Sequence, residues 1–483
     1  WPCYGHDTSR NGVAGVRLAP PLHLQWQYVP RHQPRPAWPE PGKELNRLQF
    51  DLAFQVSVGN GLVYFGSSSE HKVSALDLAT GRGRWQFITG GPVRFAPAVA
   101  GKRLFVASDD GCVYCLDALK GSEIWRFRVG PRDERMIGNE QMISRWPARS
   151  GLLVKDGVVY VTAGMWSSDG VYVHALRASD GSVIWTNDTC GKIYMGMPHA
   201  NREGIAGVAP QGYLVLTGNT LVVPNGRCPP AGFDIRTGEF LYLRNNWTKM
   251  HHAGSSWVVA HDGLIWSGRR AAAYVQHVRL PGPRPPVGLR EREHAGSKLL
   301  TKRDWGGPSP GEGLIAWDGR TGDERFALIG KYRAIFKDDT MYAAGREAIA
   351  AVDLKAFAAA APEFTGTGKV DPDIPESEIT PVLKKRMTRS LYPWHLSKVT
   401  PMDTKRFEKW RETVGWTYAM CLAGDVLFTG SRGKVRALRT ATGGKIWEAK
   451  VDGDVRGLAV VPGKLLVSTS SGRILCFGTD PNA

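Results

Sequence analysis

The sequence predicts an all-β protein in which four-stranded antiparallel sheets repeat around a central axis, as an eight-bladed β-propeller. Three observations support this fold class. The 483 residues exceed the size at which one hydrophobic core stops growing. Glycine, the residue of tight turns, occurs 57 times. One short pattern also returns at several places along the chain.

The repeated pattern is VSALDLATGRGRW at residues 73–85. An apolar residue is followed five positions later by glycine and nine positions later by an aromatic residue, as in Leu76, Gly81 and Trp85. This spacing predicts a strand, a turn whose glycine takes positive φ, and a second strand carrying a large ring. Copies lie at 113–125, 173–185 and 435–447, with weaker copies at 231–242 and 314–326. The rings of Trp85, Trp125, Trp185 and Trp447 are predicted to anchor adjacent blades.

Upstream of each hairpin, two apolar alternating segments flank another glycine turn, for example at residues 97–108 and 152–164. The unit is therefore a four-stranded blade of roughly 40 residues. The last unit, Val455–Gly478, supplies only three strands, so Leu22–Tyr28 is predicted to be its outer strand and to close the ring. Blades are expected to begin near Phe54, Val93, Arg149, Gly204, Ala253, Arg333, Trp416 and Val455.

Two long insertions interrupt the single propeller domain expected over residues 1–483. Residues 278–312 are rich in proline and arginine and read as a loop. Residues 357–415 include Thr404–Val414, whose spacing predicts a helix with Asp403 as its N-cap. Insertions of this length usually cover or shape a functional face.

The repeat resembles the pyrroloquinoline-quinone (PQQ) type propeller repeat, in which an AxDxxTGxxxW segment docks its Trp between blades. The resemblance covers most of the chain. It implies, as one alternative, a quinone-dependent alcohol dehydrogenase in which carboxylates and an Asn hold calcium beside PQQ. The chain lacks the adjacent cysteines and the C-x-x-C-H haem site of those enzymes, so PQQ with calcium is expected only under this alternative and no cofactor otherwise.

A second function implied by the resemblance is a non-catalytic scaffold of the cell envelope, like the lipoprotein subunit of outer-membrane assembly machinery. The chain starts at Trp1 rather than Met, which predicts an exported, periplasmic or secreted protein whose leader has been removed. No apolar run is long enough to cross a bilayer. We expect a monomer without a membrane span.

The charge of the chain favours a polyanionic partner, because 62 Lys and Arg face 45 Asp and Glu and the net charge is +17. A solvated cationic surface is the plain alternative. Nucleic acid is not expected, since the basic residues are scattered and no reading motif is present. An acidic polysaccharide is the predicted partner.

The blade register predicts which side chains gather at one end of the channel. They precede each first strand or lie in each loop between the second and third strands. Such converging guanidiniums require an anion or interleaved carboxylates, unless they bond backbone carbonyls between blades. These residues are Gln55, Glu70, His71, Lys72, Arg94, Asp109, Asp110, Arg145, Trp146, Arg149, Trp166, Asp169, His199, Asn201, Arg202, Asn225, Arg227, His251, His252, Arg269, Arg270, Arg333, Arg346, Glu347, Tyr418, Arg432 and Arg456.

The function predicted first is a polysaccharide lyase that eliminates at a uronic acid. This reaction needs a cation on the carboxylate, a base for the C5 proton and an acid for the leaving oxygen. The predicted base is His251 or His252, of which at most one should face the channel, with His199 as a further base or orienting group. Tyr194 or Tyr418 is the predicted acid. Substrate binding is assigned to Arg94, Arg149, Arg202, Arg227, Arg269, Arg270, Trp146, Trp166, Asn201 and Asn225, and no metal site is expected.

The remaining candidates depend on carboxylates and thiols. A glycoside hydrolase would pair Asp110 with Glu70 or Asp169. Of the seven cysteines, Cys190 and Cys228 could form a disulfide. Cys112 and Cys115 should point to opposite faces of one strand and serve packing rather than zinc binding.

Overall fold

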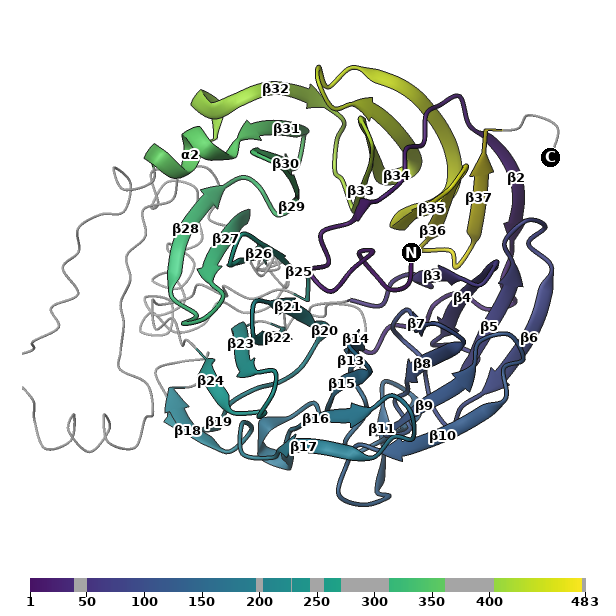
Figure 1. The fold of residues 1–483 in the computed structure, drawn as a ribbon, viewed down its shortest axis with the longest axis vertical. Coiled ribbons are helices and arrows are strands. Elements are labelled where there is room, and N and C mark those ends of the chain that lie inside the picture. The colour runs from purple at the N-terminus through teal and green to yellow at the C-terminus, as the bar shows by residue number, and fades with distance from the viewer. Residues whose placement is uncertain are drawn as a thin grey trace, which may run out of the picture.

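A computed structural model describes most of the chain as β-structure arranged in a ring around a central axis (Figure 1). No helix in the described part of the chain is long and apolar enough to span a bilayer. The described residues are 1–38, 50–196, 203–226, 228–243, 256–270, 312–360 and 404–479.

Six four-stranded sheets follow one another along the chain, and each is antiparallel throughout. The first three are β3 (Val56–Gly59), β4 (Leu62–Ser67), β5 (Lys72–Asp77) and β6 (Gly83–Ile88); β7 (Ala98–Ala100), β8 (Arg103–Ala107), β9 (Cys112–Asp117) and β10 (Glu123–Arg128); and β14 (Leu153–Lys155), β15 (Val158–Ala163), β16 (Tyr172–Arg177) and β17 (Val183–Asn187). The next three are β21 (Val215–Thr217), β22 (Thr220–Asn225), β23 (Cys228–Asp234) and β24 (Phe240–Leu243); β25 (Val258–His261), β26 (Leu264–Arg270), β27 (Glu312–Asp318) and β28 (Glu324–Ile329); and β29 (Arg333–Lys337), β30 (Thr340–Ala344), β31 (Ala348–Asp353) and β32 (Glu408–Thr413).

The last sheet joins both ends of the chain. It has seven strands in the order β1-β33-β34-β35-β36-β37-β2. The N-terminal strand β2 pairs antiparallel with β37, with Trp26 opposite Cys476, as the sequence predicts for Leu22–Tyr28. The strands are β1 (Val13–Ala14), β33 (Ala419–Ala423), β34 (Val426–Arg439), β35 (Lys445–Val461), β36 (Lys464–Thr469), β37 (Ile474–Gly478) and β2 (His23–Tyr28).

A few short elements lie outside these sheets. Two are hairpins, β11 (Arg135–Gly138) with β12 (Gln141–Ser144) and β18 (Ile193–Gly196) with β19 (Glu203–Ala206). β13 (Ser150–Gly151) and β20 (Gly212–Tyr213) form a short parallel pair. The helices are η1 (Ser167–Asp169), α2 (Leu354–Ala360) and η4 (Lys405–Phe407).

The predicted anchors join each sheet to the next. Trp85 donates its indole N–H to the carbonyl of Ala118 at 3.0 Å and lies against Gly121, where φ is +74°. A Cβ at Gly121 would come within 2.5 Å of the Trp85 ring, so glycine is required both for the turn and for the close approach. Trp125, Trp185 and Trp447 make the same kind of bond to Ala178, Ile235 and Leu22 at 3.2, 3.1 and 3.0 Å, which confirms their anchoring role.

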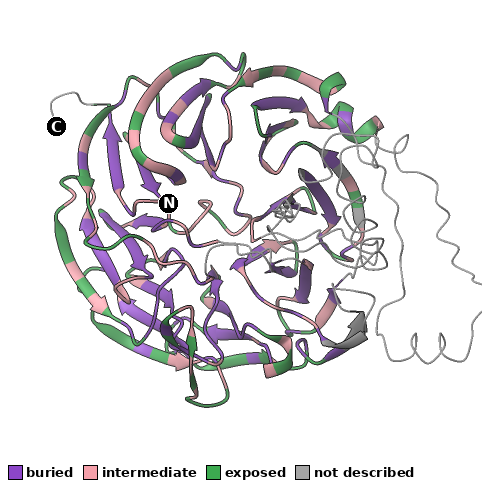
Figure 2. Cartoon of the chain, turned by 180° about the vertical axis from the view of Figure 1, so that it is seen from behind, coloured by how far each residue is buried: buried purple, intermediate pink, exposed green. Residues whose placement is uncertain are grey.

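The strand β2 takes part in the same pattern. Trp26 donates to the carbonyl of Leu78 at 3.0 Å and packs against Gly81, the turn glycine of the first sheet. The residue that anchors the chain's last sheet to its first therefore comes from the N-terminal strand. Apolar clusters fill the spaces between neighbouring sheets, for example Val56, Phe65 and Leu76 against Leu466 and Cys476. Figure 2 shows buried residues concentrated in the inner strands and exposed residues along the outer rim.

The N-terminal segment, residues 1–14, was not expected in the channel, yet it crosses the middle of the ring (Figure 1). Successive carbonyls accept hydrogen bonds from the innermost strands. Val58 N–H donates to Trp1 and Val99 N–H to Pro2, at 2.7 and 2.8 Å. Further along, Leu216, Ala260 and Leu422 donate to Thr8, Ser9 and Gly12 at 2.9, 2.8 and 2.9 Å. Strand β1 then pairs with β33.

Side chains of the N-terminal segment complete these bonds. Arg10, which is 3% exposed, donates to the carbonyls of Leu214 and Leu152 at 2.9 and 2.7 Å. The amide of Asn11 bonds both backbone groups of Phe336 in β29. The segment thus reaches the innermost strands of the first six sheets, or the residues just before them, and β33 of the last.

Two sequence predictions about the sheets were wrong. Gly204 does not begin a sheet but lies in β19, and the fourth sheet starts with β21. The predicted helix over Thr404–Val414 is the short η4 followed by strand β32, which pairs with β31. Side chains of this segment alternate between two faces, as in a strand. Trp410 is its anchor, because the indole donates to the Thr440 carbonyl at 2.6 Å and packs on Gly443.

The insertions lie mostly where the structure makes no statement. Residues 271–311 and 361–403, and with them Asp403, lie outside the described residues. What is described shows how the second insertion enters the repeat. It begins between β31 and β32, where other copies have a tight turn, and the outer strand still pairs in register, Trp410 opposite Ala351.

Candidate functional site: a pocket at the centre of the ring

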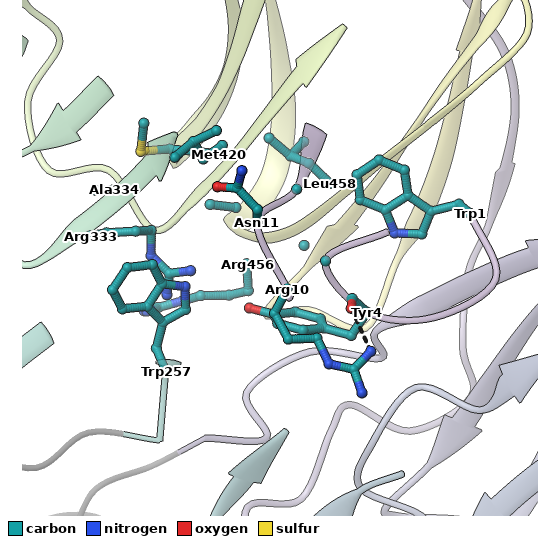
Figure 3. A pocket seen from close by; sticks show the side chains of 15 residues that line it. Trp1, Tyr4, Arg10, Asn11, Trp257, Arg333, Ala334, Met420, Arg456 and Leu458 are labelled. Carbon is teal, nitrogen blue, oxygen red and sulfur yellow. Dashed lines mark hydrogen bonds between the residues drawn. The ribbon is translucent and has the colours of Figure 1, made fainter. Parts of the chain in front are cut away.

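A pocket of about 560 Å³ opens at the centre of the ring. Many of its lining residues precede or begin an innermost strand, including Gln55, Trp257, Arg333 and Tyr418. A smaller adjoining pocket of about 410 Å³ is lined by the N-terminal segment through Trp1, Tyr4, Arg10 and Asn11 (Figure 3). Residues lining both pockets are Tyr4, Trp257, Arg333 and Arg456. The N-terminal segment is therefore the floor of this site.

One wall of the pocket is aromatic. Tyr4 of the floor stacks on Tyr213, with ring centroids 3.9 Å apart and 6° between planes. Tyr213 contacts Phe95 edge to face at 5.1 Å, and Phe95 stacks on Phe50 at 5.3 Å. The Tyr213 hydroxyl accepts a hydrogen bond from Ala96 N–H at 2.8 Å. Burial raises the pKa of Tyr213, so this wall carries no charge.

A second part of the lining is cationic and forms another wall of the pocket. The Arg333 guanidinium lies over the Trp257 ring at 5.2 Å, and that of Arg456 lies over the Tyr418 ring at 3.7 Å. Figure 3 shows Arg333, Arg456 and Trp257 beside one another. Arg456 is paired with Asp454 at 2.7 Å, whereas Arg333 has no carboxylate partner within the described residues. Arg333 therefore adds to this wall a positive charge that no described carboxylate balances.

Several sequence-predicted channel residues reach this pocket. Gln55, Arg333, Tyr418 and Arg456 line it, and each lies at the start of an innermost strand as the register predicts. Of the residues predicted to be catalytic or substrate-binding, Tyr418 is the one found there among those described. Its ring faces the Arg456 guanidinium. This geometry is compatible with two roles for Tyr418, holding that guanidinium in place or acting as an acid.

Arg94 and Arg149 share a buried carboxylate, and neither lines the pocket. Arg94 Nε is 2.6 Å from Asp109, and Arg149 Nη2 is 2.8 Å from the same carboxylate oxygen. Arg94 Nη1 is also 2.6 Å from Asp51. All four side chains are at most 2% exposed. These four residues are called the ion network below.

The ion network balances its own charge with two arginines and two aspartates. Burial alone would raise the pKa of Asp109, but the guanidiniums of Arg149 and Arg94 outweigh it and hold that pKa below 3.8. Interleaved carboxylates were one of the two ways in which converging arginines could be stabilised. The contacts of Arg94 and Arg149 thus do not support their predicted role in substrate binding.

The other described candidates lie away from the pocket lining. Trp146 is 4% exposed and its indole donates to the Asp169 carbonyl at 2.8 Å, so it packs rather than presenting a stacking face. Trp166 is 49% exposed and meets Trp38 edge to face at 5.6 Å. Asn225 is 2% exposed and its side-chain oxygen accepts a hydrogen bond from Ala209 N–H.

The rest of the predicted site is not described in full. Tyr194 lies in β18, and Arg269 and Arg270 lie in β26. Outside the described residues lie His199, Asn201, Arg202, Arg227, His251 and His252. Sequence reasoning missed Tyr4 and Phe50, because neither belongs to the repeat. It also missed Trp257, although this residue directly precedes β25, a position that the register predicts to face the channel.

Of the two cysteine predictions, one was wrong and the other is confirmed. Cys190 is a free, fully buried thiol near the Val171 carbonyl, so the proposed disulfide with Cys228 was wrong. Cys112 and Cys115 are buried in different clusters on the two sides of β9, which confirms that they serve packing. Burial raises the pKa of Cys112 to about 11.

Comparison with known proteins shows the fold of the chain and a family match over part of it. Residues 69–245 match the family model described as outer membrane protein assembly factor BamB. The chain overlays a quinohemoprotein alcohol dehydrogenase from Comamonas testosteroni with a TM-score of 0.56 at 14% identity, over 100% of this chain and 81% of that one. The chain has the fold of the PQQ-type β-propellers. It also overlays the computationally designed Ika8 protein, with a TM-score of 0.52 at 12% identity over 90% of this chain and 100% of that one.

Two curated relatives of this PQQ-type propeller match over shorter stretches. A tetrathionate hydrolase from Acidithiobacillus ferrooxidans is 24% identical over 217 residues, which is 43% of this chain and 38% of the relative. BamB from Escherichia coli K12 is 30% identical over 96 residues, which is 20% of this chain and 22% of the relative. The chain therefore spans well under half the length of either relative.

The described pocket residues do not fit the quinone site implied by the PQQ-type repeat. Calcium needs several oxygen ligands, mainly carboxylates. No Asp or Glu lines either pocket, and no cluster of three potential metal ligands occurs among the described residues. We derive no step through PQQ or calcium for this propeller.

Proposed function

We propose that the protein binds a small dianion in its central pocket and that its substrate class is a sulfur oxyanion with an apolar middle. The observation that carries this proposal is that Arg333 and Arg456 line one pocket together with the aromatic rings of Tyr4, Phe50, Phe95 and Tyr213. Arg333 has no carboxylate partner within the described residues, so a bound anion would supply one.

Tetrathionate has the chemistry that suits this pocket. Each end is a sulfonate, which accepts paired hydrogen bonds from a guanidinium. The middle is a chain of polarisable sulfur atoms, which make favourable contacts with aromatic rings. Similarity to a tetrathionate hydrolase over 43% of this chain supports the choice.

A hydrolytic step would need a base that activates water. The described lining residues include neither a carboxylate nor a histidine. The bases predicted from the sequence, His199, His251 and His252, lie outside the described residues. Binding by the two arginines is therefore the part of the proposal that the described contacts support.

The test is titration calorimetry with tetrathionate at low ionic strength, together with an assay for tetrathionate loss. We expect binding by the unmodified protein and a loss of about 10- to 100-fold in affinity for Arg333→Gln, the effect of removing one charged hydrogen-bonding partner. Arg126→Gln is the matched control, because that guanidinium is 65% exposed and outside the pocket lining. Equal affinities for the two variants, or no binding of tetrathionate, would refute the proposal.

The closed architecture belongs to the same proposal. We propose that the six four-stranded sheets and the seven-stranded sheet form one domain of eight blades, with β35 shared by the last two. Pairing of β2 with β37 and the packing of Trp26 on Gly81 support closure. A location in the cell envelope is consistent with similarity to an outer membrane assembly factor.

A second candidate function is protein docking in the envelope. The family-model match to an assembly factor supports it, and so does the hairpin β11–β12. There Ile137 and Met142 pair across the two strands and are 73% and 50% exposed. Changing both to Asp should abolish co-purification of an envelope protein while leaving anion affinity unchanged. Loss of both properties, or of neither, would count against this function.

The polysaccharide lyase stays a prediction from the sequence. No described contact favours it over a smaller anion, and its three predicted histidines, His199, His251 and His252, lie outside the described residues. Incubation with a panel of uronic-acid polysaccharides, followed by ultraviolet absorbance of unsaturated products, tests it directly. No absorbance change with any of them would exclude it.

A further inference from the structure

The chain between β2 and β3 covers one side of the pocket in two described stretches, Arg35–Trp38 and Phe50–Ala53. These stretches are called the covering segment. Ala37 N–H donates to the Asp51 carboxylate at 2.9 Å, which ties the two stretches together. Phe50 and Leu52 line the pocket. The covering segment therefore forms part of the wall that a ligand would touch.

Each polar group of the covering segment bonds a different part of the ring. Arg35 N–H donates to Ser68 at 2.9 Å, and the Arg35 carbonyl accepts from Arg94 at 2.8 Å. Asn139, at the turn of hairpin β11–β12, donates to the Pro36 carbonyl at 2.8 Å. The Trp38 indole donates to Gln211 at 3.2 Å, and its ring lies 5.6 Å from the Arg149 guanidinium. The segment is fixed across several sheets.

Asp51 links this segment to the ion network. Its carboxylate lies 2.6 Å from Arg94, and both side chains are 1% exposed. The residues on either side of Asp51, Phe50 and Leu52, face the pocket instead. The same division occurs in the loop before β7, since Arg94 enters the network while Phe95 stacks on Phe50 at 5.3 Å. In each of the two stretches, one residue carries charge in the ion network, and its neighbour in the sequence presents an apolar side chain to the pocket.

We propose that Asp51 is a positioning residue for the pocket and that it holds Phe50 and Leu52 as the wall that selects ligands with an apolar portion. This inference rests on the proposed function, because it assigns the selectivity of the same pocket. The arginine wall supplies attraction for any small anion, whereas Phe50, Leu52 and Phe95 contact only the uncharged part of a ligand. Selectivity and charge recognition then reside on different walls.

The selectivity experiment compares tetrathionate with sulfate, an anion without an apolar middle. Asp51→Asn should lower affinity for tetrathionate about tenfold and change sulfate affinity little, since it releases only the apolar wall. Phe50→Ala should have the same selective effect without touching the ion network. Arg333→Gln should weaken both anions, and Asp156→Asn, an exposed carboxylate, should change neither. An equal loss for both anions in Asp51→Asn and Phe50→Ala would overturn the proposal.

A readout without ligand separates this inference from the proposed function. Hydrogen exchange at residues 50–53 and the fluorescence of Trp38 should report loosening of the covering segment in Asp51→Asn. If the unmodified protein binds neither anion, the proposed function fails, yet faster exchange in Asp51→Asn would still support positioning. Unchanged exchange would overturn it. Should Asp51→Asn fail to fold, Phe50→Ala and Leu52→Ala decide by their effect on the tetrathionate-to-sulfate affinity ratio.

Discussion

Different interactions hold the floor of the central pocket and the covering segment on its other side. The floor is the N-terminal segment, whose carbonyls accept backbone hydrogen bonds from Val58, Val99, Leu216, Ala260 and Leu422. The covering segment on the other side depends on the buried charges of the ion network. Backbone bonds require only that the inner strands keep their register, whereas buried ions require particular side chains. The comparison implies that point substitutions should disturb the two ends unequally.

The largest expected effect is the loss of the carboxylate shared by the network. Asp109→Asn leaves Arg94 and Arg149 buried without that counter-ion, and should reduce the free energy of unfolding by about 3–5 kcal/mol. Denaturant unfolding measures the change. Asp156→Asn, on an exposed turn, is the control. A loss below about 1 kcal/mol would mean that the network contributes little, and that both ends rest on backbone bonds.

A smaller effect is expected at the floor. Arg10→Ala removes the side-chain bonds to Leu152 and Leu214 but leaves the backbone bonds of its neighbours in place. The free energy of unfolding should fall by about 2–3 kcal/mol, because two buried carbonyls lose a charged donor. Arg126→Ala, 65% exposed, is the control in the same denaturation experiment. A larger loss than in Asp109→Asn would reverse the order inferred from the comparison.

Acid should act on the ion network rather than on the backbone bonds of the floor. The Asp109 pKa lies below 3.8, so its ionised form stabilises the folded state above that pH, and the contribution is lost as pH falls through the folded-state value. Asp51 acts with the opposite sign at pH values above 3.8, because burial raises its pKa despite Arg94. Denaturant unfolding from about pH 4 down to about pH 2 should show the acid loss in the unmodified protein. The loss should be absent in Asp109→Asn, and its persistence there would assign it to another group.

The smallest effect concerns the edge of the covering segment. Arg35 pairs with Glu140 on the hairpin β11–β12, and their side chains are 41% and 81% exposed. Exposed pairs contribute about 0–1 kcal/mol, so Glu140→Ala should change stability by less than about 1 kcal/mol. Hydrogen exchange at residues 35–38 should also remain close to that of the unmodified protein. Marked loosening would show that the surface pair, and not the network, holds this stretch.

The parts of the fold that repeat could be predicted from sequence. Turn glycines and anchor rings recur at fixed spacing, so Trp85 and Trp125 were assigned from local pattern alone. The same register placed Arg333 and Arg456 at the channel. Trp410 was not assigned as an anchor, because an insertion replaces the turn before it. The charged residues of β32 also occur at helical spacing, which concealed the alternation of the strand.

The parts that occur once could not be predicted in this way. One of the two carboxylate partners of Arg94 is Asp51, 43 residues earlier in a stretch with no repeat signal. Tyr4 and Trp257 meet in the pocket although 253 residues separate their positions, and no spacing rule connects them. Charge patterning alone therefore suggested an open arginine funnel, whereas the described residues form the ion network of Arg94 and Arg149 beside a smaller cationic wall of Arg333 and Arg456.

The N-terminal segment also fixes how such a ring can change in evolution. Its residues meet the innermost strands largely in the order in which those strands occur along the chain, from Trp1 at β3 to Gly12 at β33. A duplicated or deleted sheet would shift every later strand out of reach of its carbonyl. Gene duplication could therefore alter the circumference only together with a change in the length of these fourteen residues. The length of the N-terminal segment therefore limits the number of repeats in the ring.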